Sequence, residues 1–510
     1  MVYDVVIVGS GGAGLSAALS AKEKGATVLV VSEGFPTRSQ TCMAQGGINA
    51  ALANEQEDSV ALHIEDTLRS SKGLGSPIMI EKMCEGAIET VEWLNSIGVP
   101  FSRTDEGKIA QRRLGGTASS RACYSQDYTG LKILHTLYDN CLKEGITFLN
   151  EHLLLSLVDG GATFLDIKTT KPIMIEAKSL IMATGGYSGI YHGFTTNTNQ
   201  STGDGIAIAY HAGAEISNME FVQFHPTGLR KSGVLISESA RGAGGHLVND
   251  KGERFVDELG ARDVVSRAIW AEIEKGNEVF LDIRHLGEEF IDENIPQERK
   301  LSIMYEGVDP VSEMMPIAPV AHYSMGGIAV DDDLMSTVSG FFAVGECSNA
   351  RVHGANRLGG NSLLEIVAFG RLAGENAAKF SGKLALKEKD DSQAFIEGIY
   401  DSKNEVDFYE KRELLGELFY KNAGIVRNET ALKSLLVTLE EMKKVLPLMG
   451  IVDSSRCYNT NLTEFIKFQN TLEVGIMIAQ GALNREESRG AHYREDFPDM
   501  NVDFEKDTLS

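Results

Sequence analysis

The sequence predicts an α/β protein with three parts: a parallel sheet carrying a nucleotide-binding turn, an inserted α+β segment, and a helical C-terminal region. Three observations support this fold class. Residues 4–31 have the pattern of strand, glycine-rich turn, helix and strand. A second apolar strand ends in glycines at 180–186, and a third at 340–346. Beyond residue 380 the apolar residues follow helical spacing.

Composition places the chain among ordinary globular proteins. Its 510 residues, 43% of them hydrophobic and 24% charged, are enough for several domains. The net charge of −24 argues against a nucleic-acid partner, because phosphate backbones attract clustered Lys and Arg. No stretch approaches the roughly 18 apolar residues of a membrane span, and no signal peptide precedes the first strand. We therefore expect a cytoplasmic protein with no direct membrane span, attached to a membrane only through partner subunits.

The cysteines are scattered along the chain without a close pair. This spacing predicts neither a disulfide framework nor an iron–sulfur motif, and no other pattern predicts a metal site. Any iron–sulfur cluster would belong to a partner. The six cysteines are Cys42, Cys84, Cys123, Cys141, Cys347 and Cys457.

The glycine-rich turn after the first strand predicts a dinucleotide site. Gly9 permits the tight turn, Gly11 lets the backbone approach a pyrophosphate, and Gly14 allows the helix to pack closely on the strand. The N-terminus of the helix then faces the phosphates. The motif does not distinguish NAD from FAD. The expected contact residues are Gly9, Ser10, Gly11, Gly12, Ala13 and Gly14.

A ribose-binding side chain is expected about 20 positions after the turn, where Ser32 and Glu33 are neighbours. We favour Ser32, because a shift of one residue at a strand end turns the side chain away. Residues 34–47 are rich in small and polar residues and predict a loop that forms a wall of the cofactor site.

The remaining elements follow from periodicity and from glycine positions. Ala183, Thr184 and Gly185 end a strand and let the backbone lie against a flat ligand, and Asp204 suits the first turn of the next helix. We expect helical spacing over 58–72, 77–97, 131–143, 414–420, 431–445 and 462–483, a loop over 101–127, and short alternating strands over 147–180.

The pattern changes between residues 218 and 322, where elements become shorter and fewer strands end in glycine. This change predicts an inserted domain, after which the nucleotide-binding pattern resumes. The predicted domains are 1–217 and 323–380 for the two parts of the nucleotide-binding domain, 218–322 for the insertion, and 381–510 for the helical C-terminal domain.

Several longer motifs resemble the flavoprotein subunit of succinate dehydrogenase and fumarate reductase, a family that also includes L-aspartate oxidase. The most specific is HGANRLGGNSLLE at 353–365, joined by FHPTG at 224–228, RDVV at 262–265, HY at 322–323 and RGAHYREDFP at 489–498. The resemblance covers essentially the whole chain. It implies a Rossmann-like FAD-binding domain, an inserted α+β capping domain and a C-terminal helical domain.

FAD is the cofactor that the resemblance implies. In respiratory members a histidine at the position of Gln40 bonds covalently to the flavin, and an amide cannot make that bond. We therefore expect non-covalent FAD, which favours fumarate reduction, since covalent attachment raises the flavin potential in the family. Besides the opening turn and Ser32, the implied cofactor residues are Ser39, Gln40, Thr41, Gln45, Gly46, Gly47, Ala183, Thr184, Gly185, Asp204, Glu346, Ser362 and Leu363.

The implied substrate is a four-carbon dicarboxylate held between the FAD-binding and capping domains. A dianion needs cations and donors at both carboxylates, and His225, His322 and Arg357 supply them. Ser237 retains a hydroxyl where threonine is common in the family.

Fumarate reduction needs a hydride from flavin N5 on one alkene carbon and a proton on the other. Chemistry alone would select a histidine as the acid. The family instead assigns the proton to an arginine, matched by Arg262, although a guanidinium pKa lies above about 12 and the side chain must be reprotonated at once. The family's relay is matched by Glu238 and Arg241, but Ala243 stands where glutamate is common.

Two alternatives compete with this function. L-Aspartate oxidase also lacks the flavin-linking histidine, but it carries an acidic residue before a Gly-Gly pair, where this chain has the apolar Leu114. A non-catalytic flavin-binding or assembly protein would lose the cationic residues that this chain has kept. Because the chain has no iron–sulfur ligands, we expect it to dock an iron–sulfur subunit and, through it, a quinone-reactive anchor subunit.

Overall fold

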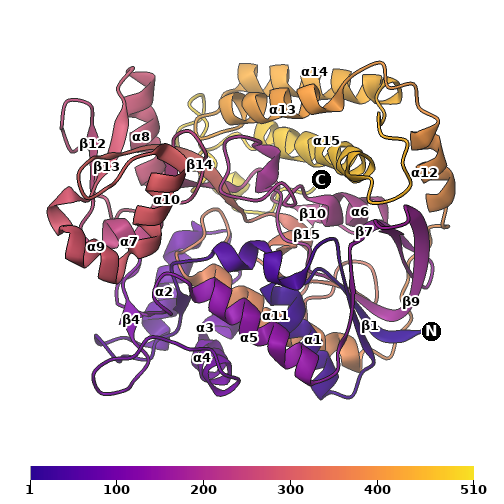
Figure 1. Cartoon of the computed structure of the whole chain (residues 1–510), viewed down its shortest axis with the longest axis horizontal. Coiled ribbons are helices and arrows are strands. Elements are labelled where there is room, and N and C mark those ends of the chain that lie inside the picture. Colours follow the sequence, from indigo (N-terminus) through magenta and orange to yellow (C-terminus); the bar gives the residue numbers. More distant parts are fainter. Residues whose placement is uncertain (1) are drawn as a thin grey trace.

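The computed structural model describes residues 2–510. In its seven-stranded central sheet, β1 (Tyr3–Val8) lies between β2 (Val28–Ser32) and β9 (Lys171–Met182), and all three are parallel (Figure 1). The parallel set continues with β6 (Thr147–Asn150) beside β2 and β16 (Phe341–Ala343) beside β9. Both faces of β2 are buried, which explains its unbroken apolar run. The carboxyl ends of these strands therefore share one edge of the sheet.

The strands over 147–180 include one long member, β9, which differs from the short strands predicted there. Its second half belongs to the parallel set, while its first half pairs antiparallel with β8 (Gly161–Asp166), and β8 pairs with β7 (His152–Val158). The predicted loop at 101–127 also contains two short strands, because distant backbone segments pair there. They are β4 (Gln111–Arg112) and β5 (Ala122–Cys123), in one sheet with β3 (Ile48–Asn49).

Helix α1 (Gly12–Glu23) packs against α11 (Asn361–Lys379), although about 340 residues separate them in sequence. Glycines permit this approach, since a Cβ atom at Gly374 would lie 2.1 Å from the carbonyl oxygen of Ala17. Helix α5 (Thr129–Lys143) also packs on α1. The helix that follows the glycine-rich turn is therefore enclosed by later parts of the chain.

The helical spacing over 77–97 corresponds to two helices rather than one. Helix α3 (Pro77–Glu85) ends at Gly86, and α4 (Ala87–Ser96) begins directly after it. Glycine is a poor helix former, which explains why the helix breaks at this residue. Helix α2 (Val60–Ser71) precedes them and is capped by the Ser59 side chain, which accepts a hydrogen bond from the Leu62 amide.

A second, antiparallel sheet of four strands lies apart from the main sheet and has its own apolar core (Figure 1). This part of the molecule corresponds to the predicted insertion, whose exact boundaries remain a prediction. Its strands, in spatial order, are β11 (Val222–Leu229), β14 (Met315–Ser324), β13 (Val279–Asp282) and β12 (His246–Asn249). Its helices are α7 (Glu238–Gly242), α8 (Arg262–Glu274), α9 (Glu288–Asn294) and α10 (Pro296–Glu306).

A small three-stranded sheet lies where the chain enters and leaves this region. It consists of β10 (Ile216–Ser217), β15 (Gly327–Ala329) and β17 (Ser348–Asn349). Helix α6 (Asp204–His211) precedes it and begins at Asp204, as the sequence predicts. The short elements thus connect the two larger sheets.

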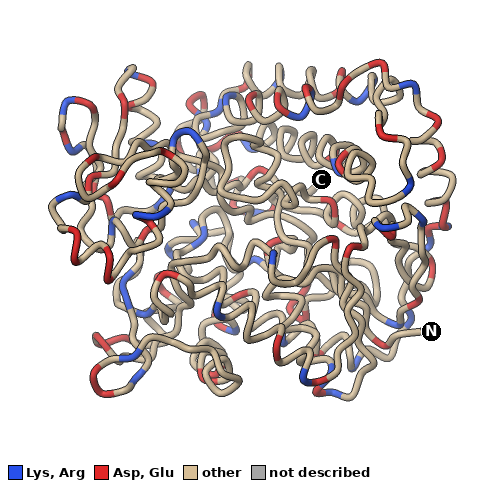
Figure 2. The backbone as a smooth tube through the Cα atoms, in the orientation of Figure 1, with Lys and Arg blue, Asp and Glu red and all other residues tan. Residues whose placement is uncertain are grey.

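The C-terminal region is helical, as expected, and lies along one side of the molecule (Figure 1). The last residues fold back over the protein, where Arg485 pairs with the buried Glu220 at 2.6 Å. Acidic and basic residues both occur around the periphery (Figure 2). Within residues 2–510, no helix is long and apolar enough to cross a membrane. The helices are α12 (Ser392–Tyr400), α13 (Phe408–Asn422), α14 (Glu429–Val445) and α15 (Thr460–Asn484).

Candidate active site

The glycine-rich turn connects β1 to α1 with the tight packing expected of a dinucleotide site. Gly9 has φ +111°, and a Cβ atom there would lie 2.2 Å from the carbonyl oxygen of Ala183. A Cβ atom at Gly14 would lie 2.0 Å from the carbonyl oxygen of Gly9. Gly14 therefore packs beneath the turn and does not line the cavity above it. The start of α1 is left facing that cavity.

One long cavity runs from this turn to the second sheet. It brings together segments that are far apart in sequence, including the loop at 39–47, the end of β9 and the start of α11. Of the predicted cofactor residues, those lining it are Gly9, Ser10, Gly11, Gly12, Ala13, Ser32, Ser39, Gln40, Thr41, Gln45, Gly46, Gly47, Ala183, Thr184, Gly185, Asp204, Glu346, Ser362 and Leu363.

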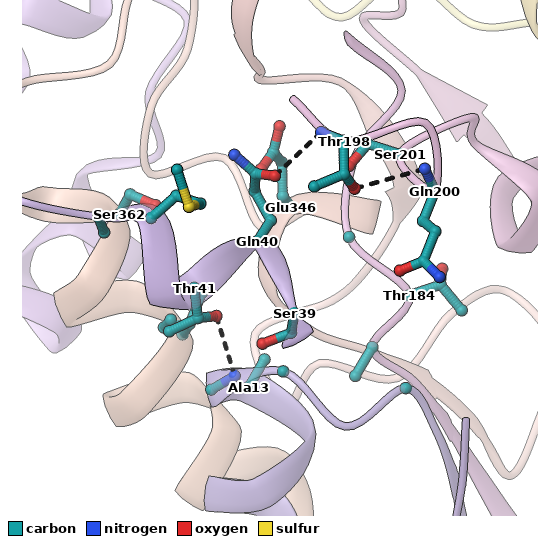
Figure 3. A pocket seen from close by; sticks show the side chains of 18 of the residues that line it. Ala13, Ser39, Gln40, Thr41, Thr184, Thr198, Gln200, Ser201, Glu346 and Ser362 are labelled. Carbon is teal, nitrogen blue, oxygen red and sulfur yellow. Dashed lines mark hydrogen bonds between the residues drawn. The ribbon is translucent and has the colours of Figure 1, made fainter. Parts of the chain in front are cut away.

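Several polar atoms in the cavity wall fit a bound polar cofactor. The hydroxyls of Ser39 and Thr184 and the Oε1 atom of Gln45 are buried and have no hydrogen-bond partner among residues 2–510. The Thr41 hydroxyl accepts a hydrogen bond from the Gly12 amide at 3.1 Å and so ties the loop to the turn. Buried polar groups are normally paired. Unpaired buried groups at this cavity suit a dinucleotide such as FAD, and Figure 3 shows Ser39 and Thr41 beside the turn at Ala13.

Ser32 and Glu33 both line the cavity at the end of β2. The Ser32 hydroxyl donates to the Gly34 carbonyl at 2.6 Å. The Glu33 carboxylate accepts two hydrogen bonds from Lys467 on α15, at 2.9 and 3.0 Å. Burial raises the pKa of Glu33, and the charge of Lys467 opposes this effect. Because both side chains reach the cavity, the preference for Ser32 at the ribose stays a prediction.

The other end of the cavity holds a chain of buried charges. Arg262, at the start of α8, donates from Nη2 to the Glu238 carboxylate at 2.8 Å, and the same carboxylate lies 3.9 Å from Arg241. Glu238 also accepts a hydrogen bond from the Gly115 amide at 2.7 Å. Arg262 and Glu238 line the cavity, whereas Arg241 lies behind them. The three residues thus form a charged path that leads away from the cavity.

Glu238 is an anion in this arrangement. Burial by itself raises the pKa of its carboxyl, but the charges of Arg262 and Arg241 outweigh burial and lower the pKa to about 2. Burial lowers the pKa of Arg241, and the charge of Glu238 opposes that change. Two cations therefore share one carboxylate, which leaves a net positive charge next to the cavity.

His225, His322 and Arg357 line the cavity beside Arg262. The two imidazole rings lie 5.1 Å apart. Burial, together with the charge of Arg262, holds the pKa of each histidine well below its usual value. Both are therefore neutral hydrogen-bonding groups near pH 7. The Thr227 amide donates to Nδ1 of His225 at 3.2 Å, so the ring hydrogen of His225 is on Nε2.

Arg357 supplies a second cation. Its guanidinium lies 4.4 Å from the ring centroid of Tyr323, and its Nε atom is buried without a partner among residues 2–510. Burial lowers the pKa of Arg357 to about 10, which still leaves the group charged at neutral pH. The predicted Ser237 also lines this end, where its hydroxyl caps α7. The cluster combines two cavity-lining cations with neutral donors, as a dicarboxylate requires.

The structure adds residues in or next to the cavity wall that the sequence analysis did not assign. Tyr323 follows His322 in the HY motif, and its hydroxyl donates to the buried Glu365 at 3.0 Å. Gln223 accepts a hydrogen bond from Arg262 at 3.2 Å. Thr196 and Thr198 line the cavity from a polar stretch that precedes α6. Motif neighbours could have indicated Tyr323 and Gln223, whereas no local signal marks the two threonines.

Comparisons with known proteins agree with this geometry. Residues 4–363 match the family described as "FAD binding domain", and residues 412–510 match "Fumarate reductase flavoprotein C-term". The chain is 40% identical to the 8-methylmenaquinol:fumarate reductase flavoprotein subunit of Wolinella succinogenes, over 97% of this chain and 86% of that protein. It is 38% identical to the succinate dehydrogenase flavoprotein subunit of Rickettsia felis, over 100% and 92% of the two chains.

Solved structures show the same relationship. A quinol fumarate reductase chain from E. coli superimposes with a TM-score of 0.94 at 35% identity, covering 100% of this chain and 94% of that one. The α/β fold class predicted from the sequence is thereby confirmed. The chain belongs to the family of fumarate reductase and succinate dehydrogenase flavoprotein subunits, FAD-dependent oxidoreductases that interconvert fumarate and succinate.

Proposed function

We propose that this chain is the catalytic flavoprotein subunit of a fumarate reductase. The observation that carries the proposal is the buried path Arg262, Glu238 and Arg241, which begins at the cavity beside His225, His322 and Arg357. When bound, FAD supplies hydride chemistry at N5. The residues of this chain would bind the dicarboxylate, exclude water and deliver the proton.

Substrate binding is assigned to four side chains. Arg357 grips one carboxylate through its charge and its unpartnered donor. His225 and His322 contribute neutral donors, because their low pKa keeps them uncharged near pH 7. Ser237 adds a hydroxyl. The net positive charge of the cluster offsets the cost of burying a dianion.

Arg262 is the proposed proton donor. Hydride addition to one alkene carbon of fumarate makes the other carbon strongly basic, and Arg262 gives that carbon its proton. Glu238, ionised and hydrogen-bonded to Arg262, passes a replacement proton from Arg241. The reaction consumes two electrons and two protons per succinate. Nothing in the structure explains what Ala243 changes in this path.

FAD is proposed to be held without a covalent bond. Gln40 lines the cavity where family members carry a flavin-linking histidine, and a carboxamide does not form that bond. Retention then depends on the turn at Gly9 to Gly14 and on the surrounding loop. The absence of the covalent bond favours fumarate reduction over succinate oxidation.

Partners are proposed from the relatives and from the cysteines. One relative is named as the flavoprotein subunit of an 8-methylmenaquinol:fumarate reductase. Electrons must therefore pass between that flavoprotein subunit and a quinol. The cysteines of this chain are free and scattered. We infer an iron–sulfur partner subunit, a quinone-reactive anchor beyond it, and a peripheral position on the cytoplasmic side of the membrane.

The test is to compare three reactions of the purified holoprotein: reduction of fumarate by a reduced dye, oxidation of succinate, and oxidation of L-aspartate. Fumarate reduction should be the fastest. Leu114 is buried against the cavity and offers no charge to a substrate ammonium, so aspartate should not be turned over. Aspartate turnover without succinate turnover would refute the proposal in favour of an aspartate oxidase.

A further inference from the structure

The side chain of Gln40, in the loop at 39–47, contacts the polar loop at 195–198. Its Oε1 atom accepts a hydrogen bond from the Thr198 amide at 3.1 Å, and its Nε2 atom donates to the Thr196 carbonyl at 3.3 Å. Figure 3 shows the Gln40 side chain pointing at Thr198 across the cavity wall. Both ends of the carboxamide are therefore engaged by one short backbone segment.

That segment lies along the edge of β14 next to His322. The Thr196 amide donates to the Ala321 carbonyl at 2.9 Å, and the Asn197 side chain donates to the His322 carbonyl at 2.8 Å. The Thr196 hydroxyl lies 2.8 Å from Nδ1 of His322. The loop thus contacts the histidine through both its backbone and its ring.

The neighbouring hydrogen bonds favour the tautomer of His322 that carries its hydrogen on Nε2. Asn197 also donates to the Thr196 hydroxyl oxygen, at 3.4 Å, which leaves the hydroxyl hydrogen free to point at Nδ1. A neutral imidazole that accepts at Nδ1 carries its hydrogen on Nε2. Nε2 is the ring nitrogen left for a ligand in the cavity that His322 lines.

We propose that Gln40 is a positioning residue for His322: its carboxamide braces the loop at 195–198, and Thr196 in turn holds the imidazole with Nε2–H directed at a substrate carboxylate. This inference rests on the proposed dicarboxylate substrate. It gives Gln40 a role besides the absence of a flavin bond. It also links the loop at 39–47, which lines the proposed FAD site, to the substrate site through three residues that are far apart in sequence.

The test uses Gln40→Ala and Thr196→Val in the FAD-loaded protein, with Thr196→Ser as the conservative variant. Calorimetric titration of the oxidised protein with fumarate measures binding without turnover. Each of the first two variants should bind fumarate about tenfold more weakly, the usual effect of one hydrogen bond to a charged group. The double variant should bind fumarate no more weakly than the weaker-binding of the two single variants. Thr196→Ser should bind fumarate as the wild type does. Gln393→Ala, at an exposed glutamine on α12, is the matched control.

A second readout does not depend on substrate. Nitrogen-15 spectra of histidine-labelled protein, with His322 assigned from a His322→Gln variant, should show Nε2–H in the wild type and a tautomer mixture in Gln40→Ala. If Gln40→Ala lost FAD but its His322 nitrogen-15 signals were unchanged, the inference would be overturned. It would also be overturned if the losses of fumarate affinity in the two single variants multiplied in the double variant. Failure of the wild type to bind fumarate would instead refute the proposed function, while the spectra would still decide the role of Gln40.

Discussion

Arg262 and Glu238 are joined by two hydrogen bonds to a single oxygen: Nε and Nη2 of the arginine both donate to Oε2 of the glutamate, at 3.2 and 2.8 Å. The second oxygen, Oε1, accepts from the Gly115 amide and faces Arg241. The carboxylate thus lies between two arginines and is hydrogen-bonded to the one in the cavity wall. The link from Glu238 to Arg241, at 3.9 Å, is an ion pair longer than a hydrogen bond.

Arg262→Ala should abolish fumarate reduction while FAD remains bound. Loss of a positioned acid lowers rates by about 10²–10⁴-fold. The measurement is dye-linked fumarate reduction together with the ratio of flavin to protein absorbance. Arg267→Ala is the control, because Arg267 lies on the same helix and pairs with Asp263. Ordinary turnover by Arg262→Ala would exclude it as the proton donor.

Gly14→Ala should destabilise the protein and reduce its FAD content. The new methyl group would lie 2.0 Å from the Gly9 carbonyl oxygen, so the turn must move, at a cost of about 1–3 kcal/mol or more. Thermal unfolding and flavin content measure the effect. Gly398→Ala on α12 is a matched control, since nothing lies within 4 Å of its added methyl group, and it should stabilise by about 0.5–1 kcal/mol. Normal FAD content in Gly14→Ala would contradict this reading of the turn.

Precipitation of the holoprotein in acid should release all of its flavin. Under the proposed non-covalent binding, with an amide at position 40, only contacts that are lost with the fold hold the FAD. The absorbance of the supernatant and the pellet near 450 nm gives the answer. Yellow colour that stays with the washed pellet would show a covalent bond to some other residue.

Glu298→Gln should make stability less dependent on pH. Glu298 on α10 is fully buried, and burial, together with the nearby Asp127, raises its pKa to about 8. This pKa lies above that of the same group in the unfolded chain. The contribution of Glu298 to the free energy of unfolding is therefore fully present below about pH 4.5 and is lost as the pH rises towards 8. The glutamine variant lacks this loss. Its advantage over the wild type should grow by about 1 kcal/mol per pH unit between pH 5 and 8. Urea unfolding at several pH values measures the difference, and parallel curves for the two proteins would contradict the prediction.

The sequence by itself determined the features that depend on local spacing. The strand, turn and helix at residues 4–31, the start of α6 at Asp204 and the C-terminal helices follow from apolar periodicity and glycine positions, which act over a few residues. The motif at 353–365 identified the family for a similar reason, since its run of residues is long enough to be specific. These are features for which neighbours in sequence are also neighbours in space.

Only the tertiary structure decided which distant segments meet. Gln40, Thr196 and His322 are brought into contact by the packing of a loop against β14, and no local pattern marks Thr196. The pairing of β3 with β5 and the burial of Glu298 beside Asp127 likewise depend on long-range packing. The tertiary structure also places His225 and His322 where desolvation and neighbouring arginines hold their pKa well below its usual value, and neither effect can be read from sequence spacing.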